Sequence, residues 1–168
     1  MAKSTYAGLK VLVVEDDDES FKSLRVTLKS ITGVDPIRTR GIVDTLAVLE
    51  KFKEVVKGPI ATPDLCLALA IIDQDLSLAR AQNDPHYPEV PVGEEGVFLV
   101  DHVLDRSPIT QAGILTANSE VNNKGFEIGK RGCHFYLNKG SSSTDLEKRI
   151  REILDGFLDA YEEHHRRP

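Results

Sequence analysis

The sequence predicts an α/β protein built on a doubly wound, five-stranded parallel sheet. Two apolar runs, residues 9–14 and 65–72, are almost continuous rather than alternating, which is typical of strands buried on both faces. Strand-like runs alternate with helix-like segments along the whole chain, and this alternation favours right-handed crossovers in a parallel sheet. The strand-like runs also end in polar residues, at the position where open α/β sheets bind their ligands.

Five strands and five helices are expected, in strict alternation. The expected strands cover residues 9–14, 34–37, 65–72, 109–116 and 133–137. The expected helices cover residues 20–30, 41–56, 96–105, 118–128 and 144–164. Each helix except 118–128, which contains three asparagines and a glycine, places apolar side chains at helical spacing.

Glycine and proline mark the ends of elements in the N-terminal half. Gly33 follows the first helix and is expected to end it. Gly58 and Pro59 end the second helix in the same way. The strand over residues 34–37 contains Pro36, which cannot donate a hydrogen bond to a neighbouring strand, so we expect this strand at the edge of the sheet.

Residues 74–95 interrupt the alternation. This segment has little periodicity and contains Pro85, Pro88 and Pro91. Loops beyond about 12–15 residues are uncommon in compact domains and are usually functional or disordered. We therefore expect one domain over residues 1–168, with a long loop inserted directly after the second buried strand.

The last helix is expected to begin with a capping box and to run beyond the sheet. Thr144 and Glu147 have the spacing of that box. The apolar positions Ile153, Phe157 and Tyr161 continue past the length needed to cover a strand. This stripe packs either on the protein's own surface or on a second copy of the chain, which leaves a homodimer as one alternative.

Composition is that of an ordinary soluble globular protein. The 168 residues are 40% hydrophobic and 29% charged, with a net charge of −6 and no basic tract long enough for nucleic acid. No apolar run approaches the ~20 residues of a membrane span, and the first residues lack the apolar core of a signal peptide. Cys66 and Cys133 are expected to open strands as reduced thiols. These features favour a cytoplasmic location.

Polar side chains stand at the carboxyl ends of four expected strands. Glu15 and Asp16 follow the first strand, and Asp73 follows the third. Thr116 ends the fourth strand, and Lys139 lies just after the fifth. Carboxylates gathered at one sheet edge repel one another and favour a divalent cation, and oxygen ligands suit Mg²⁺. Such a pocket, with one lysine and one hydroxyl, is suited to stabilising a phosphoryl group on a carboxylate.

At these residues the chain resembles the receiver domain of two-component response regulators. The matching segments are residues 11–17, 71–76, 114–117 and 135–139, in the order and at the strand ends that the family shows. The resemblance covers nearly the whole chain and implies a flavodoxin-like (βα)₅ fold with strand order 2-1-3-4-5. It implies a signalling switch rather than an enzyme.

The resemblance also implies a role for each residue of the cluster. Asp73 would accept a phosphoryl group from a phosphohistidine of a sensor histidine kinase or phosphotransfer protein. Mg²⁺ would be held by Asp16, Asp73 and the backbone carbonyl of Asp75, with Glu15 acting mainly through a metal-bound water. These roles describe a phosphorelay protein whose output is a change in protein–protein contacts with a downstream protein.

Five residues would have further roles in the implied switch. Lys139 would pair with the phosphoryl oxygens, Thr116 would move to hydrogen-bond them, and Tyr136 would turn inward. Asp75 and Asn118 would set the lifetime of the phosphate. The chain departs from the family at Gly140, where proline is usual and often follows a cis bond.

Two features leave alternatives open. Receiver domains commonly continue into an output domain, but here one helix follows the last strand and no DNA-binding domain is expected. Residues 73–77 also resemble the nucleophile motif of haloacid-dehalogenase-like phosphatases, which likewise form an aspartyl phosphate with Mg²⁺. The order of motifs favours the receiver, because the acidic pair precedes Asp73 and none follows Lys139 at a strand end.

Overall fold

The computed structural model describes the backbone of residues 5–56, 63–77, 90, 93–107, 109–117 and 133–166. The expected helix over residues 118–128, Asn118 with it, lies outside these residues. Most of the expected loop over residues 74–95 lies outside them as well. The five strands and the four α-helices considered below all lie within the described part of the chain.

The five strands form one parallel sheet in the order β2-β1-β3-β4-β5. The strands are β1 (Lys10–Val14), β2 (Ile37–Thr39), β3 (Leu67–Asp73), β4 (Gln111–Thr116) and β5 (Phe135–Asn138). Every pair of neighbours is parallel, so the crossovers carry the helices to the two faces of the sheet. The doubly wound fold expected from the sequence, with its strand order, is confirmed.

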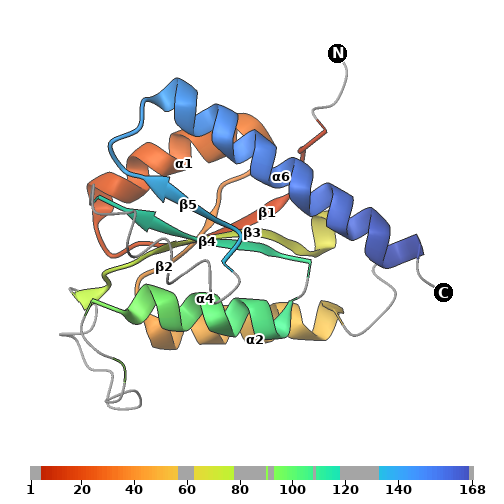
Figure 1. The fold of residues 1–168 in the computed structure, drawn as a ribbon, viewed down its shortest axis with the longest axis horizontal. Coiled ribbons are helices and arrows are strands. Elements are labelled where there is room, and N and C mark those ends of the chain that lie inside the picture. The colour runs from red at the N-terminus through yellow and green to blue at the C-terminus, as the bar shows by residue number, and fades with distance from the viewer. Residues whose placement is uncertain are drawn as a thin grey trace.

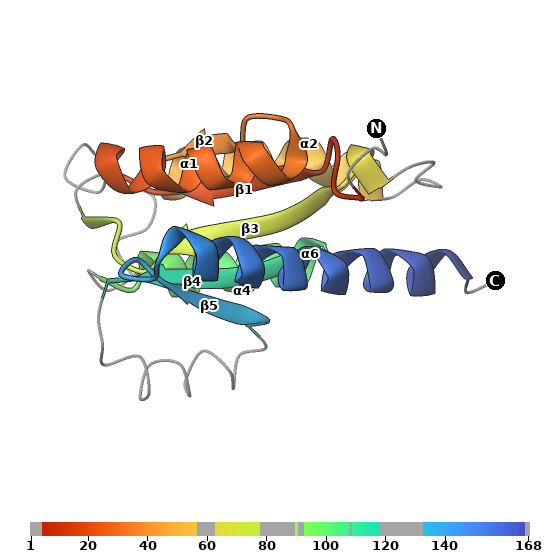
Figure 2. The ribbon, with the colours of Figure 1, turned by 90° about the horizontal axis from the view of Figure 1, so that it is seen from above.

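Helices cover both faces of the sheet in two layers (Figure 1). They are α1 (Asp18–Thr32), α2 (Ile42–Val56), α4 (Glu95–Arg106) and α6 (Ser143–Arg166), with a short 3₁₀ helix η1 (Pro63–Leu65) before β3. Helices α1 and α6 lie on one face, and α2 and α4 lie on the other (Figures 1 and 2). The arrangement follows from apolar stripes on the helices packing against apolar strands.

Strand β3 is the centre of the core. All seven of its residues are buried, because helices cover both of its faces and strands flank both of its edges. Alternate side chains enter two separate apolar clusters: Leu69 and Ile71 pack toward α1 and α6, whereas Ala70 and Ile72 pack toward α2 and α4. The continuous apolar run therefore has the cause that the sequence suggested.

Several element boundaries differ from the expected ones. β2 begins at Ile37, directly after Pro36, so the proline lies outside the strand at the sheet edge. Cys66 and Cys133 precede β3 and β5 rather than opening them, and both are free thiols. Gly33 ends α1 as expected, with φ of 74° and its N–H donated to the carbonyl of Lys29.

The expected capping box at the start of α6 is wrong. The helix begins at Ser143, and the hydroxyl of Ser142 accepts a hydrogen bond from the N–H of Asp145 at 3.2 Å. The backbone carbonyl of Ser142 accepts from Leu146, which is the first helical bond. The cap is therefore Ser142 rather than Thr144.

The far end of α6 packs on the protein's own surface. Phe157 is fully buried, and Tyr161 lies against the same apolar cluster with its ring 6.1 Å from that of Phe157. The hydroxyl of Tyr6 also donates to Asp155 of this helix at 2.7 Å. This contact of Tyr161 corresponds to the first of the two alternatives for the stripe. None of the described helices is long and apolar enough to cross a membrane.

Candidate functional site

The parallel register brings the four polar strand ends to one edge of the sheet. Val14 pairs with Ile72, Asp73 with Leu115, and Thr116 with Asn138. The residue after each strand therefore projects from the same edge. Glu15 follows β1 and Lys139 follows β5, so residues far apart in the sequence meet around Asp73.

Hydrogen bonds within the β1–α1 turn fix the acidic residues there. Asp17 is the N-cap of α1, and its carboxylate accepts from the N–H of Ser20 at 2.8 Å. The same bond lowers the pKa of Asp17. The carboxylate of Glu15, which is fully buried, accepts from the N–H of Asp17 at 3.0 Å. Asp16 thus lies between two residues that are held in place.

Lys139 bridges the two buried carboxylates. Its ammonium donates a hydrogen bond to Oδ2 of Asp73 at 2.9 Å and forms an ion pair with Oε2 of Glu15 at 2.8 Å. Burial alone lowers the pKa of Lys139, but hydrogen bonding to Glu15 and Asp73 and their charges outweigh it and raise the pKa. Lys139 is therefore a fixed positive charge beside Asp73.

The environment of Asp73 disfavours its ionised form. Burial raises its pKa to about 7; Lys139 opposes the shift, and the neighbouring Glu15 adds to it. One lysine thus does not compensate two buried carboxylates. The ionised form of Asp73 needs further positive charge near neutral pH.

The acidic residues fit a hard divalent cation. One carboxylate oxygen each from Glu15, Asp16 and Asp73 lie within 4.8 Å of one another. Glu15 Oε2 is buried, and it also forms the ion pair with Lys139 at 2.8 Å. Three clustered carboxylates, two of them buried, are the kind of oxygen donor set that Mg²⁺ prefers.

A pocket of about 390 Å³ opens over this cluster. Its walls include Asp16, Asp73, Thr116 and Lys139, so the structure brings these four residues together as expected. Asp75 also lines the pocket; its N–H donates to Oδ1 of Asp73 at 3.3 Å. The pocket has room for a phosphoryl group on Asp73.

The start of α4 packs against the backbone of Asp73, which sequence reasoning missed. A Cβ atom on Gly96 would lie 2.2 Å from the carbonyl oxygen of Asp73, so only glycine allows this approach. The N–H of Gly96 also donates to the carbonyl of Gln74 at 3.1 Å. Close packing against a backbone carbonyl leaves no signal in the sequence beyond the glycine itself.

Glu95 is a second residue that the sequence did not single out. Its side chain is buried, and Oε2 accepts from the N–H groups of Gly93 at 2.9 Å and Leu76 at 3.4 Å. Gly93, with φ of 85°, is itself part of the pocket wall. Glu95 therefore joins the two described ends of the segment that follows β3.

Tyr136 is not in the acidic pocket. It is 46% exposed and lines a separate pocket of about 480 Å³ with Asp145, Leu146 and Arg149 of α6. Gly140, the departure after Lys139, follows a trans peptide bond, and its N–H donates to the side chain of Asn138 at 2.7 Å. Asn118 lies outside the described residues.

Comparisons with known proteins agree with this architecture. No protein-family model and no curated protein matches the sequence. Among solved structures, the fold is similar to a CheY-like response regulator receiver domain protein from Methanospirillum hungatei JF-1. The TM-score is 0.63, with 20% identity, and the match covers 90% of this chain and 97% of that one.

Two further solved structures cover almost the entire chain. The signal receiver domain of an HD domain-containing protein from Pseudomonas fluorescens Pf-5 has a TM-score of 0.57 and 16% identity, covering 99% of this chain and 98% of that one. An uncharacterized protein from Neptuniibacter caesariensis has a TM-score of 0.65 and 18% identity, covering 98% of each chain. The chain therefore has the receiver fold, and the resemblance seen in the sequence is confirmed at that level.

Proposed function

We propose that this protein is the phosphoacceptor receiver of a two-component phosphorelay and that Asp73 carries the phosphoryl group. One observation supports the proposal above all others. A buried carboxylate at the centre of a receiver fold lies beside a fixed lysine and two further acidic residues, under an open pocket. This arrangement suits group transfer to Asp73 better than a purely structural ion pair.

In the proposed reaction a carboxylate oxygen of Asp73 attacks the phosphorus of the donor. The bond between phosphorus and the departing histidine nitrogen breaks as the new oxygen–phosphorus bond forms. Asp73 must be ionised to attack, and Lys139 lies where it can stabilise that form and then the phosphoryl oxygens. Mg²⁺, held by Glu15, Asp16, Asp73 and the carbonyl of Asp75, would supply the remaining positive charge.

Of the two proposed switch residues, Thr116 lines the acidic pocket and Tyr136 lies outside it. Thr116 would hydrogen-bond the phosphoryl group from its place in the pocket wall. Tyr136, exposed on β5, would turn inward into the space that Thr116 leaves. Asp75 and Asn118 would tune the phosphate lifetime. A population shift in the face around β5 and the expected helix over residues 118–128 would then alter which proteins bind there.

The proposed partners follow from this chemistry. A sensor histidine kinase or phosphotransfer protein would supply the phosphoryl group in the cytoplasm, and a downstream protein would recognise the phosphorylated form. The protein would act as a switch rather than as a turnover enzyme. A self-association through α6 is not required, since Tyr161 already packs on the protein's own apolar cluster.

The direct test is labelling by a small phosphodonor. Incubation of the purified protein with Mg²⁺ and acetyl phosphate should add one phosphoryl group, visible by intact mass. Asp73→Asn should abolish the addition, and chelation of Mg²⁺ should suppress it. Labelling of the Asp73→Asn variant would contradict the proposal, and sustained hydrolysis of a phosphomonoester would favour the phosphatase alternative.

A further inference from the structure

We infer that Arg38 is a positioning residue for the metal-binding turn, and that it acts through the backbone of Glu15 rather than through its charge. The inference rests on the proposed function, because it concerns the Mg²⁺ affinity of the same site. Arg38 lies on β2, the edge strand, and does not line the pocket over Asp73. Its influence on that pocket must pass through the residues it contacts.

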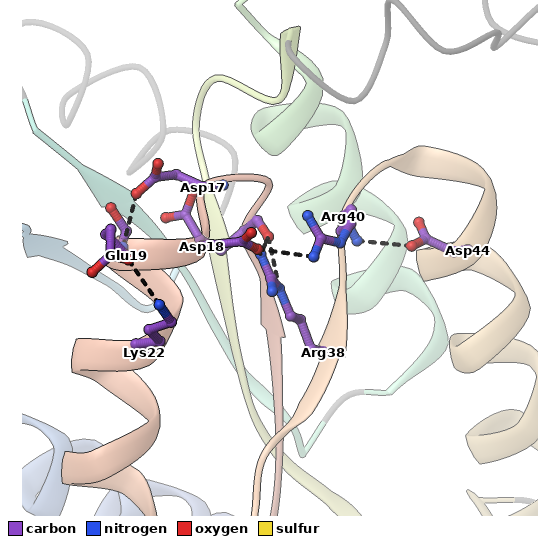
Figure 3. Close-up of polar contacts among 9 residues, drawn as sticks. Asp17, Asp18, Glu19, Lys22, Arg38, Arg40 and Asp44 are labelled. Carbon is purple, nitrogen blue, oxygen red and sulfur yellow. Dashed lines mark hydrogen bonds and ion pairs between the residues drawn. The ribbon is translucent and has the colours of Figure 1, made fainter.

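The guanidinium of Arg38 holds the acidic turn at two points. Its Nε and Nη2 atoms both donate to the backbone carbonyl of Glu15, each at 3.2 Å. Nη2 also pairs with Oδ1 of Asp18 at 2.8 Å. Figure 3 shows the side chain of Arg38 directed toward Asp18 at the start of α1. One planar group therefore links the two ends of the turn over residues 15–18.

These contacts complete the anchoring of Glu15. The N–H of Glu15 donates to the carbonyl of Thr39 at 3.0 Å, so β2 binds both backbone groups of this residue. The side chain of Glu15 ion-pairs with Lys139, and its other oxygen accepts from Asp17. Since Asp16 directly follows, the direction in which its carboxylate leaves the backbone depends on how Glu15 is held.

Arg38 is itself held rigidly enough for this role. Its side chain is only 19% exposed, and its guanidinium carbon lies 4.5 Å from the centre of the Phe21 ring. A planar cation stacked on an aromatic ring and donating to two acceptors has little freedom to rotate. A lysine could keep the charge but could not make both contacts with the same geometry.

Arg40 provides a matched control within the same polar cluster. It also pairs with Oδ1 of Asp18, at 2.9 Å (Figure 3), but its side chain is 53% exposed. No contact of Arg40 with the Glu15 carbonyl is present among the described residues. Removing either arginine removes one positive charge from the same carboxylate. Only the removal of Arg38 also releases the backbone of Glu15.

If Arg38 acted through its charge, its removal would affect Mg²⁺ binding in the opposite direction from the loss of its contact with Glu15. Loss of a nearby positive charge reduces repulsion of the cation, so charge alone should make binding equal or tighter. Loss of a positioning contact should weaken it, and the removal of outer partners of metal ligands typically costs about tenfold or more in affinity. Arg38→Met should therefore weaken Mg²⁺ binding about tenfold, whereas Arg40→Met should leave it unchanged or slightly tighter.

The experiment is a calorimetric titration of Mg²⁺ into the full chain, for the unchanged protein, Arg38→Met, Arg38→Lys and Arg40→Met. Circular dichroism verifies that each variant is folded. Arg38→Lys should also bind Mg²⁺ more weakly than the unchanged protein, although its charge is kept, and it decides the matter if Arg38→Met does not fold.

Two results would overturn the inference. One is Mg²⁺ affinity equal to or tighter than that of the unchanged protein in the folded Arg38 variants. The other is equal weakening in Arg38→Met and Arg40→Met, which would place the effect on Asp18 rather than on Glu15. Failure of the unchanged protein to bind Mg²⁺ or to accept a phosphoryl group would instead contradict the proposed function, and the role of Arg38 with it.

Discussion

At the scale of single residues, the main feature of the molecule is that Asp73 is a buried carboxylate with only partial charge compensation. The end of β3 is enclosed by apolar side chains and by α4, yet it carries a carboxylate beside a second buried one. Lys139 compensates only in part, and the pKa of Asp73 stays near 7. A site that holds a group in an unfavourable charge state is suited to changing that state.

The first prediction concerns the pH dependence of stability without metal. Folded Asp73 keeps its proton up to about pH 7, whereas the unfolded chain releases it near the ordinary value of 3.8. Since the folded state binds more protons in this window, the contribution of Asp73 to the free energy of unfolding should fall as pH rises from about 4 to about 7.

Urea unfolding in Mg²⁺-free buffer at several pH values measures this contribution. Asp73→Asn serves as the control, because the amide has no proton to lose. Above pH 7 the variant should be the more stable protein, by up to ~4 kcal/mol. A constant difference between the two proteins across the whole pH range would contradict the assignment.

The second prediction concerns Gly96. Gly96→Ala should destabilise the protein by about 1–3 kcal/mol and slow phosphoryl transfer, because the new methyl group must displace the backbone of Asp73. Gly156→Ala is the matched control: it is also helical, but its nearest atom, in Gln111, would be 3.5 Å away. That change should stabilise by up to ~1 kcal/mol. Equal changes in stability for the two variants would show that the close packing of Gly96 on the Asp73 backbone does not contribute.

The sequence predicted the residues of the site that stand at strand ends. Glu15, Asp73 and Lys139 could be found because parallel strands bring their carboxyl ends together whatever the details of packing. Arg38 and Glu95 could not, because the groups they hold are backbone atoms that only the folded chain brings near. A side chain bonded to a distant carbonyl or N–H leaves no spacing pattern in the sequence.

At the scale of elements, boundaries were less predictable than the elements themselves. The strands and helices follow from runs of apolar residues, which tolerate a shift of one or two positions at either end. β2 begins after Pro36 because the proline lacks the N–H that a neighbouring strand would need. The start of α6 was misplaced because residues 141–144 offer four hydroxyl side chains in a row, each of which could cap a helix.

The third prediction tests the corrected helix cap. Ser142→Ala should lower the free energy of unfolding by about 1 kcal/mol, because the hydroxyl of Ser142 accepts from the N–H of Asp145. Thr144→Ala, within the helix, should change it by only a few tenths of a kcal/mol. Thermal or urea unfolding of both variants gives the comparison. A larger loss of unfolding free energy in Thr144→Ala would show that Thr144 caps the helix, as the sequence predicted.

At the scale of the whole molecule, two apolar clusters pack on opposite faces of one sheet, and the polar cluster lies at the carboxyl ends of its strands. The α1–α6 and α2–α4 layers each pack on one face, and β3 contributes to both clusters. The acidic pocket thus lies at the carboxyl end of β3, between the start of α1 in one layer and the start of α4 in the other. A change in charge at Asp73 therefore acts on the part of the protein where the helices α1 and α4 begin.

The fourth prediction is that Mg²⁺ stabilises the whole fold. A ligand that binds only the folded state at ten times its dissociation constant adds about 1.4 kcal/mol to the free energy of unfolding. The melting temperature should rise with Mg²⁺ concentration, and chelation should reverse the rise. Asp16→Asn should remove most of the effect, because it takes one carboxylate from the cluster. An equal rise in that variant would place the cation elsewhere.

The site of phosphorylation is the most direct test of the account. After reaction with acetyl phosphate and Mg²⁺, borohydride reduces an aspartyl phosphate to homoserine, and peptide mass spectrometry then identifies the modified residue. We expect homoserine at position 73, dependent on Mg²⁺ and lost or greatly reduced in Lys139→Met. Homoserine at Asp16, Asp75 or any other carboxylate, with Asp73 unmodified, would contradict it.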